Sequence, residues 1–314
     1  MATEKIEHSQ LPIRGLNLHI AHIGATGSPT VVFLHGFPEI WYTWRYQMLA
    51  VAAAGFRAIA PDFRGYGLSD QPPEPEKASW KDLDDDLLAI LDSLSVPKAF
   101  IVAKDFGAMA AYNFALLHPD RVSGVVTLGI PFISEAFSSA FTEIPEGYYL
   151  SRWRVPGRAE ADFGRLEVKT VVRNIYILFS GSEFPNAKED QEIMDLVDPS
   201  TPLPPWFSEE DLAVYASLYE KSGFRYALQM PYRSLKESLG ITNPKVEVPV
   251  LLIMGGKDYV LKLAGYEDYI RSGMVKEFVP NLDIKFIEEG SHFVQEQYPD
   301  EVNELIVSFL KNQI

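Results

Sequence analysis

Asp105 lies at a bend between two segments of opposite character. It follows an apolar, β-rich run, AFIVA (99–103), and precedes a helical pattern from Gly107 to Leu117. Small residues on either side, Ala103 and Gly107, permit the sharp strand-to-helix turn that usually exposes a nucleophilic serine. An aspartate, with a pKa near ~3.9, is an anion at neutral pH and attacks carbon without prior deprotonation. Taken alone, the same residue also fits a simple helix cap.

Two further polar residues follow later strand-like runs. Asp258 comes after VLLIM (250–254), and His292 comes after IKFI (284–287). Ligands of open parallel sheets bind outside the carboxyl ends of the strands, so Asp105, Asp258 and His292 are expected at one edge. Nucleophile, acid and histidine, in that chain order, predict a triad in which the acid orients the histidine and the histidine activates water.

A loop that would complete this site follows the first apolar run, TVVFL (30–34). It reads HGFPE (35–39). An oxyanion hole needs one backbone N–H from such an upstream loop and one from the residue after the nucleophile. These positions are Phe37 and Phe106.

The elements that must position these residues alternate between apolar strands and amphipathic helices. This alternation predicts an α/β fold with a mostly parallel sheet covered by helices on both faces. The predicted strands are 30–34, 56–60, 99–103, 122–130, 250–254 and 284–287, and the predicted helices are 41–54, 83–94, 107–117, 265–272 and 299–312.

The alternation breaks after about residue 133. The segment that follows is rich in aromatic residues, arginine and proline, and is mainly helical in pattern. We interpret it as an inserted helical lid at 134–245, between a first core part at 1–133 and a second at 246–314.

Composition excludes several classes of protein. A formal net charge of −15 over 314 residues disfavours nucleic acid as a partner. The chain has no cysteine, so it forms no disulfide and no thiolate metal cluster. MATEKIEHSQ (1–10) lacks the apolar core of a secretory signal, NQI (312–314) is not a peroxisomal signal, and no apolar run reaches membrane-spanning length. We expect a cytoplasmic protein without membrane attachment, and the predicted chemistry needs no cofactor and no metal.

Several longer motifs together resemble the plant soluble epoxide hydrolases of the α/β-hydrolase superfamily. The resemblance runs from about residue 4 to the end of the chain and implies the fold, the lid and hydrolysis of epoxides to vicinal diols through an ester on Asp105. The aromatic residues of the predicted lid favour apolar epoxides. The motifs are HGFPEIWYTWR (35–45), APDFRGYGLSD (60–70), DFG (105–107), HPDRV (118–122), SRWRVPG (151–157), GGKD (255–258) and GSHFVQEQYPDEV (290–302).

The resemblance also implies two lid tyrosines that activate the epoxide oxygen. One precedes the SRW segment and matches Tyr149, with Tyr148 as the neighbouring alternative. The other matches Tyr232 in MPYRSL (230–235). With 15 tyrosines in the chain, the residues alone assign neither.

The chain departs from the family pattern at Lys104, where the family usually has histidine. A cation beside Asp105 favours its ionised form. We expect Glu39 of HGFPE to pair with this lysine.

Two other functions fit part of the pattern. A haloalkane dehalogenase also uses an aspartate at the bend, but it often binds halide through a tryptophan where this chain has Phe106. A small-molecule receptor on the same fold needs no complete set of nucleophile, acid and base. An ordinary esterase would require serine at 105. The oligomeric state and the physiological epoxide do not follow from the sequence.

Overall fold

The structure is a computed structural model that describes residues 5–134, 137, 144–235, 237 and 239–314. Within this part of the chain, an eight-stranded sheet has the order β1-β2-β4-β3-β5-β6-β7-β8. Neighbouring strands from β4 to β8 are parallel, and β1 and β2 add antiparallel pairs at one edge. The strands are β1 (Glu7–Ile13), β2 (Leu16–Ile23), β3 (Thr30–Leu34), β4 (Arg57–Pro61), β5 (Ala99–Lys104), β6 (Val122–Leu128), β7 (Val250–Gly255) and β8 (Leu282–Ile287).

The predicted α/β class and mostly parallel sheet are confirmed, and most element boundaries shift by only one to three residues. The strand predicted at 122–130 ends earlier, at Leu128, because Gly129 adopts a left-handed φ of 80°. A Cβ at Gly129 would lie 3.2 Å from Nζ of Lys104 and 3.3 Å from Oδ2 of Asp258. The chain therefore leaves the sheet here through a residue without a side chain, beside the predicted site.

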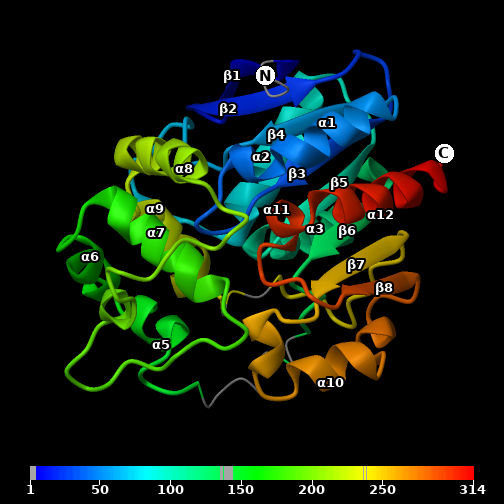
Figure 1. Ribbon diagram of the computed structural model, residues 1–314. Helices are drawn as coiled ribbons and strands as arrows, with labels where there is room; N and C mark the ends of the chain where they lie inside the picture. Colours follow the sequence, from blue (N-terminus) through cyan, green and yellow to red (C-terminus); the bar gives the residue numbers. More distant parts are fainter. Residues whose placement is uncertain (1–4, 135–136, 138–143, 236, 238) are drawn as a thin grey trace.

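Helices cover both faces of the sheet, as the alternation of side chains along each strand requires. In β3, Val31 and Phe33 pack with α1 and α12, whereas Val32 and Leu34 pack with α2 and α3 on the other face. Figure 1 shows α1 and α12 on the near face. The core helices are α1 (Arg45–Ala53), α2 (Trp80–Ser93), α3 (Phe106–Leu117), α10 (Tyr266–Arg271), α11 (Val294–Gln297) and α12 (Pro299–Lys311).

The chain between β6 and β7 forms the helical group on the left of Figure 1. Its helices are α5 (Tyr149–Trp153), α6 (Arg158–Phe163), α7 (Val168–Phe179), α8 (Glu209–Ser222) and α9 (Arg225–Leu228), followed by the helical turn η7 (Gln229–Arg233). The domain boundaries at 133/134 and 245/246 stay predictions. Within the predicted lid, residues 135–136, 138–143, 236 and 238 lie outside the described residues.

A buried carboxylate ties this helical group to the core. Oε1 of Glu296, in α11, accepts hydrogen bonds from the hydroxyls of Tyr176 in α7 at 3.2 Å and Tyr215 in α8 at 3.0 Å. Oε2 accepts from the guanidinium of Arg45 at 2.6 Å, and this guanidinium also pairs with Asp211 of α8 at 3.1 Å. Charge-assisted hydrogen bonds therefore join α7 and α8 of this helical group to the helices that cover the sheet.

Candidate active site

Asp105 occupies the bend between β5 and α3, with a φ of 52° and a ψ of −127°. Such backbone strain costs of order 1–3 kcal/mol and persists where the surrounding structure enforces it. A Cβ at Gly107 would lie 2.5 Å from the carbonyl oxygen of His35, and a Cβ at Gly36 would lie 2.4 Å from Cβ of Asp105. These two glycines therefore allow α3 and the loop after β3 to close tightly around the carboxylate.

His292 lies between Asp105 and Asp258. Its Nδ1 is 3.0 Å from each carboxylate oxygen of Asp258, and its Nε2 is 3.3 Å from Oδ2 of Asp105. The loops after β7 and β8 pack backbone against backbone, since a Cβ at Gly255 would lie 2.4 Å from the carbonyl oxygen of Ser291. The structure thus brings the three predicted residues together at the carboxyl edge of the sheet.

The side chains of Asp105 and His292 are buried, with exposed fractions of 5% and 0%. Their pKa values therefore depend on burial and on the charges around them. Burial raises the pKa of Asp105, but the hydrogen bond and charge of His292 and the charge of Lys104 outweigh it, so this pKa is lowered. Burial lowers the pKa of His292 and Lys104 lowers it further, but Asp258 and hydrogen bonds to both carboxylates outweigh them, so this pKa is raised. Asp105 is therefore an anion at neutral pH, as a nucleophile requires.

Two backbone N–H groups converge on the carboxylate of Asp105. The N–H of Phe37 donates to Oδ1 at 3.2 Å, and the N–H of Phe106, the first residue of α3, is a further influence that lowers the pKa of this carboxylate. Oδ1 is thus held by the loop after β3, while Oδ2 faces His292. This arrangement leaves one oxygen to attack and places donors where negative charge would gather on the other.

Tyr232 lies over these donors. Its ring meets those of Phe37 and Phe106 edge to face, with centroids at 5.6 and 5.3 Å. Its hydroxyl is buried and has no hydrogen-bond partner among the described residues. A buried hydroxyl without a partner costs about 1–3 kcal/mol, so the hydroxyl of Tyr232 is free to donate to a ligand.

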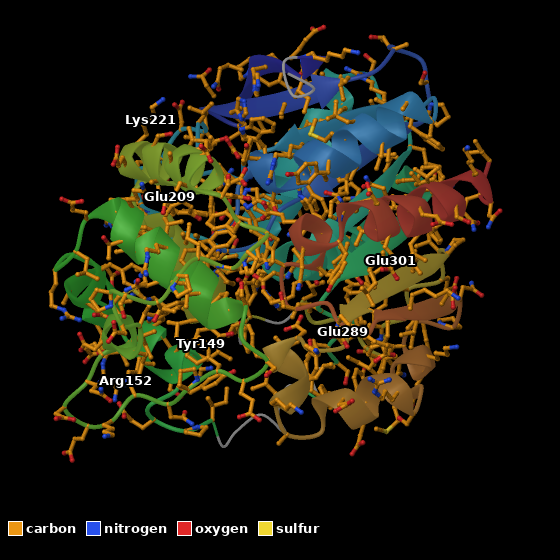
Figure 2. All side chains as sticks on the ribbon, viewed as in Figure 1. Tyr149, Arg152, Glu209, Lys221, Glu289 and Glu301 are labelled. Carbon is orange, nitrogen blue, oxygen red and sulfur yellow. The ribbon has the colours of Figure 1, made fainter. Side chains whose placement is uncertain are left out.

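Tyr149 is the second predicted lid tyrosine, at the start of α5 (Figure 2). Its ring centroid lies 6.1 Å from that of Tyr232, and its hydroxyl is 2.9 Å from the hydroxyl of Tyr259. The alternative, Tyr148, packs against Tyr149 and Phe184 instead. The geometry therefore favours Tyr149 as the partner of Tyr232.

Lys104 is fully buried, and its ammonium nitrogen lies 3.0 Å from Nε2 of His292. The expected ion pair with Glu39 is absent from the described part of the chain. Glu39 is held instead by the side-chain amide of Gln295 at 2.7 Å and the N–H of Gly36 at 3.1 Å. Burial raises the pKa of Glu39 to about 7, although the charge of Lys104 opposes the rise. The prediction of a direct pair was wrong because the lysine side chain reaches toward the histidine.

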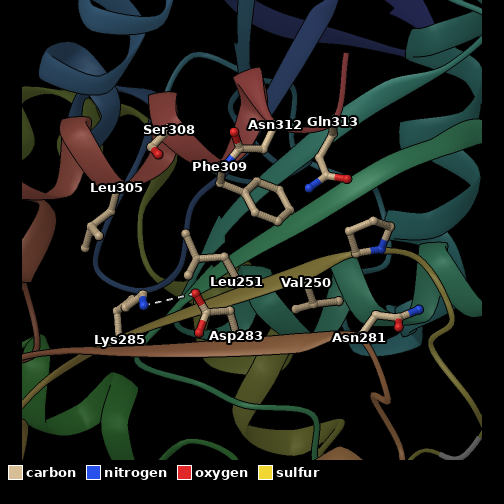
Figure 3. A pocket seen from close by; sticks show the side chains of 11 residues that line it. Val250, Leu251, Asn281, Asp283, Lys285, Leu305, Ser308, Phe309, Asn312 and Gln313 are labelled. Carbon is tan, nitrogen blue, oxygen red and sulfur yellow. Dashed lines mark ion pairs between the residues drawn. The ribbon is translucent and has the colours of Figure 1, made fainter.

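A small cavity lies beside Phe106, the residue after Asp105. This cavity of about 10 Å³, enough for roughly one water molecule, is lined by residues that include Gly36, Phe106 and Pro231. A larger cavity, of about 240 Å³, lies between β7, β8 and α12 (Figure 3). Its lining includes Pro249 and Asn281, which precede β7 and β8, so it is at the opposite end of these strands from the triad. The smaller cavity is therefore the one that belongs to the candidate site.

Tyr259, which directly follows Asp258, is a residue that the sequence did not single out. Its ring centroid lies 5.1 Å from that of His292, and its side chain is almost fully buried. Its position next to Asp258 was the only available signal, since tyrosines are frequent throughout the chain. Only the three-dimensional contact with Tyr149 distinguishes it.

The arrangement matches a known architecture. It has a strained aspartate between a strand and a helix, an acid and a histidine after the last two strands, and a helical insertion. A family profile described as the alpha/beta hydrolase fold matches residues 29–299. The chain belongs to the α/β-hydrolase family.

Within that family, the chain is similar to epoxide hydrolases. It is 36% identical over 318 residues to epoxide hydrolase 2 of Siraitia grosvenorii, covering 98% of this chain and 99% of that protein. The crystal structure of an epoxide hydrolase from Vigna radiata superposes with a TM-score of 0.89 at 35% identity, covering 98% of each chain. That of potato epoxide hydrolase I gives a TM-score of 0.88 at 34% identity, covering 98% of this chain and 100% of that one.

Proposed function

We infer that this chain is an epoxide hydrolase that converts epoxides to vicinal diols through a covalent aspartyl ester. The observation that carries this conclusion is an aspartate, not a serine, at the strained bend, with Nε2 of His292 at 3.3 Å from its Oδ2. The similarity to epoxide hydrolases over 98% of the chain supports the same conclusion.

Ester formation opens the ring. Oδ2 of Asp105 forms a bond to one epoxide carbon while the bond from that carbon to the ring oxygen breaks. The ring oxygen would be a poor leaving group as an alkoxide, so it takes a proton from Tyr149 or Tyr232 as the ring opens. Burial raises the pKa of both phenols well above its usual value, so both are protonated in the resting enzyme. The ring of Tyr232 lies beside Phe37 and Phe106, and the ring of Tyr149 lies 6.1 Å from that of Tyr232, which supports this role.

Hydrolysis releases the diol. Water attacks the carboxyl carbon of the ester and gives one proton to His292, whose imidazolium is stabilised by Asp258. The N–H groups of Phe37 and Phe106 hold the oxyanion that develops on Oδ1. When the ester bond breaks, the two protons of the water end on the second diol oxygen and on the tyrosine that had lost its proton. Asp105 is restored with one oxygen from water.

The substrate that fits best is an apolar epoxide. Aromatic side chains surround the two tyrosines, with Phe37 beside Tyr232 and with Trp153 and Phe179 beside Tyr149. The indole N–H of a tryptophan can bind halide, whereas the side chain of Phe106 offers no such donor, so dehalogenation is the weaker alternative. Structurally, the described residues contain no helix long and apolar enough to cross a bilayer. The cytoplasmic location and the lid boundaries at 134–245 are part of this proposal.

The experiment uses the His292→Gln variant, which keeps the nucleophile but lacks the base. After mixing with styrene oxide, we expect the intact protein to gain the mass of one substrate, with the adduct on the peptide that contains Asp105. The Asp105→Asn variant is the matched control and gains no mass. Halide release from chloroalkanes without diol formation from epoxides would support the dehalogenase. A folded His292→Gln variant that binds substrate but never becomes labelled contradicts the ester mechanism.

A further inference from the structure

Tyr259 brings a third phenol to the site, on the core side of the lid. Asp258 caps the short turn η8 (Tyr259–Lys262), and its Oδ1 accepts a hydrogen bond from the N–H of Val260 at 3.1 Å. Tyr259 therefore projects from the same rigid turn that holds the triad acid. Its ring is packed between His292 at 5.1 Å and Phe179 at 5.3 Å. This packing fixes the ring independently of the hydroxyl.

The hydroxyls of the two lid tyrosines are unequal. That of Tyr232 has no hydrogen-bond partner among the described residues, whereas that of Tyr149 lies 2.9 Å from the hydroxyl of Tyr259. A tyrosine hydroxyl has a single proton to donate. Tyr149 can give its proton to a substrate only if Tyr259 is the donor in the bond between them.

A phenol that accepts one hydrogen bond donates another more strongly, because hydrogen bonds in a chain polarise one another. The bond from Tyr259 would also stabilise the negative charge left on Tyr149 after proton transfer. All three phenols are fully buried, where this stabilisation is larger than in water.

We propose that Tyr259 is a positioning residue that donates its hydroxyl proton to Tyr149 and so makes Tyr149 the acid of ring opening, with Tyr232 as a supporting donor. This inference rests on the proposed function. It assigns unequal roles to the two lid tyrosines and places the cause of the difference in the core, at the residue after Asp258.

The test is a double-mutant cycle with Tyr259→Phe and Tyr149→Phe. The rate of ester formation on Asp105 is measured in single turnovers with styrene oxide by rapid quenching and intact mass. Loss of one hydrogen bond to a developing charge predicts a rate about 10-fold lower for Tyr259→Phe. Because Tyr259 acts through Tyr149, the double variant should be no slower than Tyr149→Phe alone. The rate of ester hydrolysis should be unchanged by Tyr259→Phe.

Tyr269→Phe is the matched control, because it also removes one buried tyrosine hydroxyl, whose bond goes to the carbonyl of Phe132 at 3.0 Å. It should leave ester formation unchanged, and thermal unfolding of all variants separates lost folding from lost chemistry. An unchanged rate in Tyr259→Phe, or an equal slowing by Tyr259→Phe with and without Tyr149, overturns the inference alone. A wild-type protein that forms neither ester nor diol overturns it together with the proposed function.

Discussion

Nζ of Lys104 lies 3.0 Å from Nε2 of His292, the nitrogen that also faces Asp105. This nitrogen can donate to Asp105 when the imidazole is charged, or accept from the ammonium group when the imidazole is neutral with its proton on Nδ1, where both oxygens of Asp258 accept it. Lys104 thereby favours the protonation state that a general base needs before water arrives.

Replacing Lys104 by methionine should move the pH dependence of ester hydrolysis. The lysine charge lowers the pKa of His292, so its removal raises that pKa, and the base becomes available only at higher pH. We expect the acidic limb of the hydrolysis rate to shift upward in pH, measured by rapid quenching between pH 5 and 9. Lys98→Met, an exposed position just before the same strand, is the control. An acidic limb that stays in place would show that the contact has no electrostatic effect on the base.

Asp258→Asn should separate the two chemical steps. The asparagine cannot accept from Nδ1 of His292 with the same charge, so the imidazolium loses its stabilisation and correct tautomer. By analogy with other triads, ester hydrolysis should slow by about 10³–10⁴-fold. Ester formation, which does not use this base, should change by less than about 10-fold, and the ester should accumulate in rapid-quench samples. Equal slowing of both steps would contradict the assigned role of Asp258.

Glu296→Gln should weaken the attachment of the lid. The substitution removes the charge that pairs with Arg45 and weakens acceptance from Tyr176 and Tyr215. Breaking a buried charged pair predicts a loss of about 3 kcal/mol in the free energy of unfolding, measured by urea denaturation. Glu304→Gln, at an exposed position of α12, should change it by less than about 0.5 kcal/mol. Equal stability of the two variants would argue against a stabilising role of the Glu296 contacts.

Glu39 should make folding stability depend on pH. Its pKa is raised by burial from 4.5 to about 7 in the folded protein, so the folded state binds a proton that the unfolded state has released. The contribution of Glu39 to the free energy of unfolding is therefore fully present below pH 4.5. It is lost as the pH rises through 7, by roughly 3 kcal/mol in total.

The Glu39→Gln variant lacks this titration. Relative to the wild type, its free energy of unfolding should improve steadily from pH 5 to 8, whatever constant offset the substitution introduces. Denaturation midpoints at several pH values give the difference directly. A difference that does not vary with pH would mean that Glu39 titrates normally.

The alternation of apolar strand-like runs and amphipathic helical segments was sufficient to predict the fold class. Side-chain periodicity is a local property, so apolar runs such as 30–34 and 99–103 marked β3 and β5 correctly. Gly129 shows the limit of this reasoning. The residues around it are apolar enough to continue the strand, but a Cβ at 129 would make tight contacts of 3.2 Å with Nζ of Lys104 and 3.3 Å with Oδ2 of Asp258. That crowding comes from residues far away in the sequence.

The sequence by itself determined which residue types stand at the strand ends, including Asp105, Asp258 and His292, because each follows a recognisable apolar run. Tertiary structure alone decided which polar atoms meet there. Lys104 meets His292 at 3.0 Å, rather than Glu39, and Tyr149 meets Tyr259 at 2.9 Å, although the paired residues are 188 and 110 positions apart in the sequence. Hydrogen bonds are that short in range, and no local pattern in a chain encodes the packing that brings such segments together.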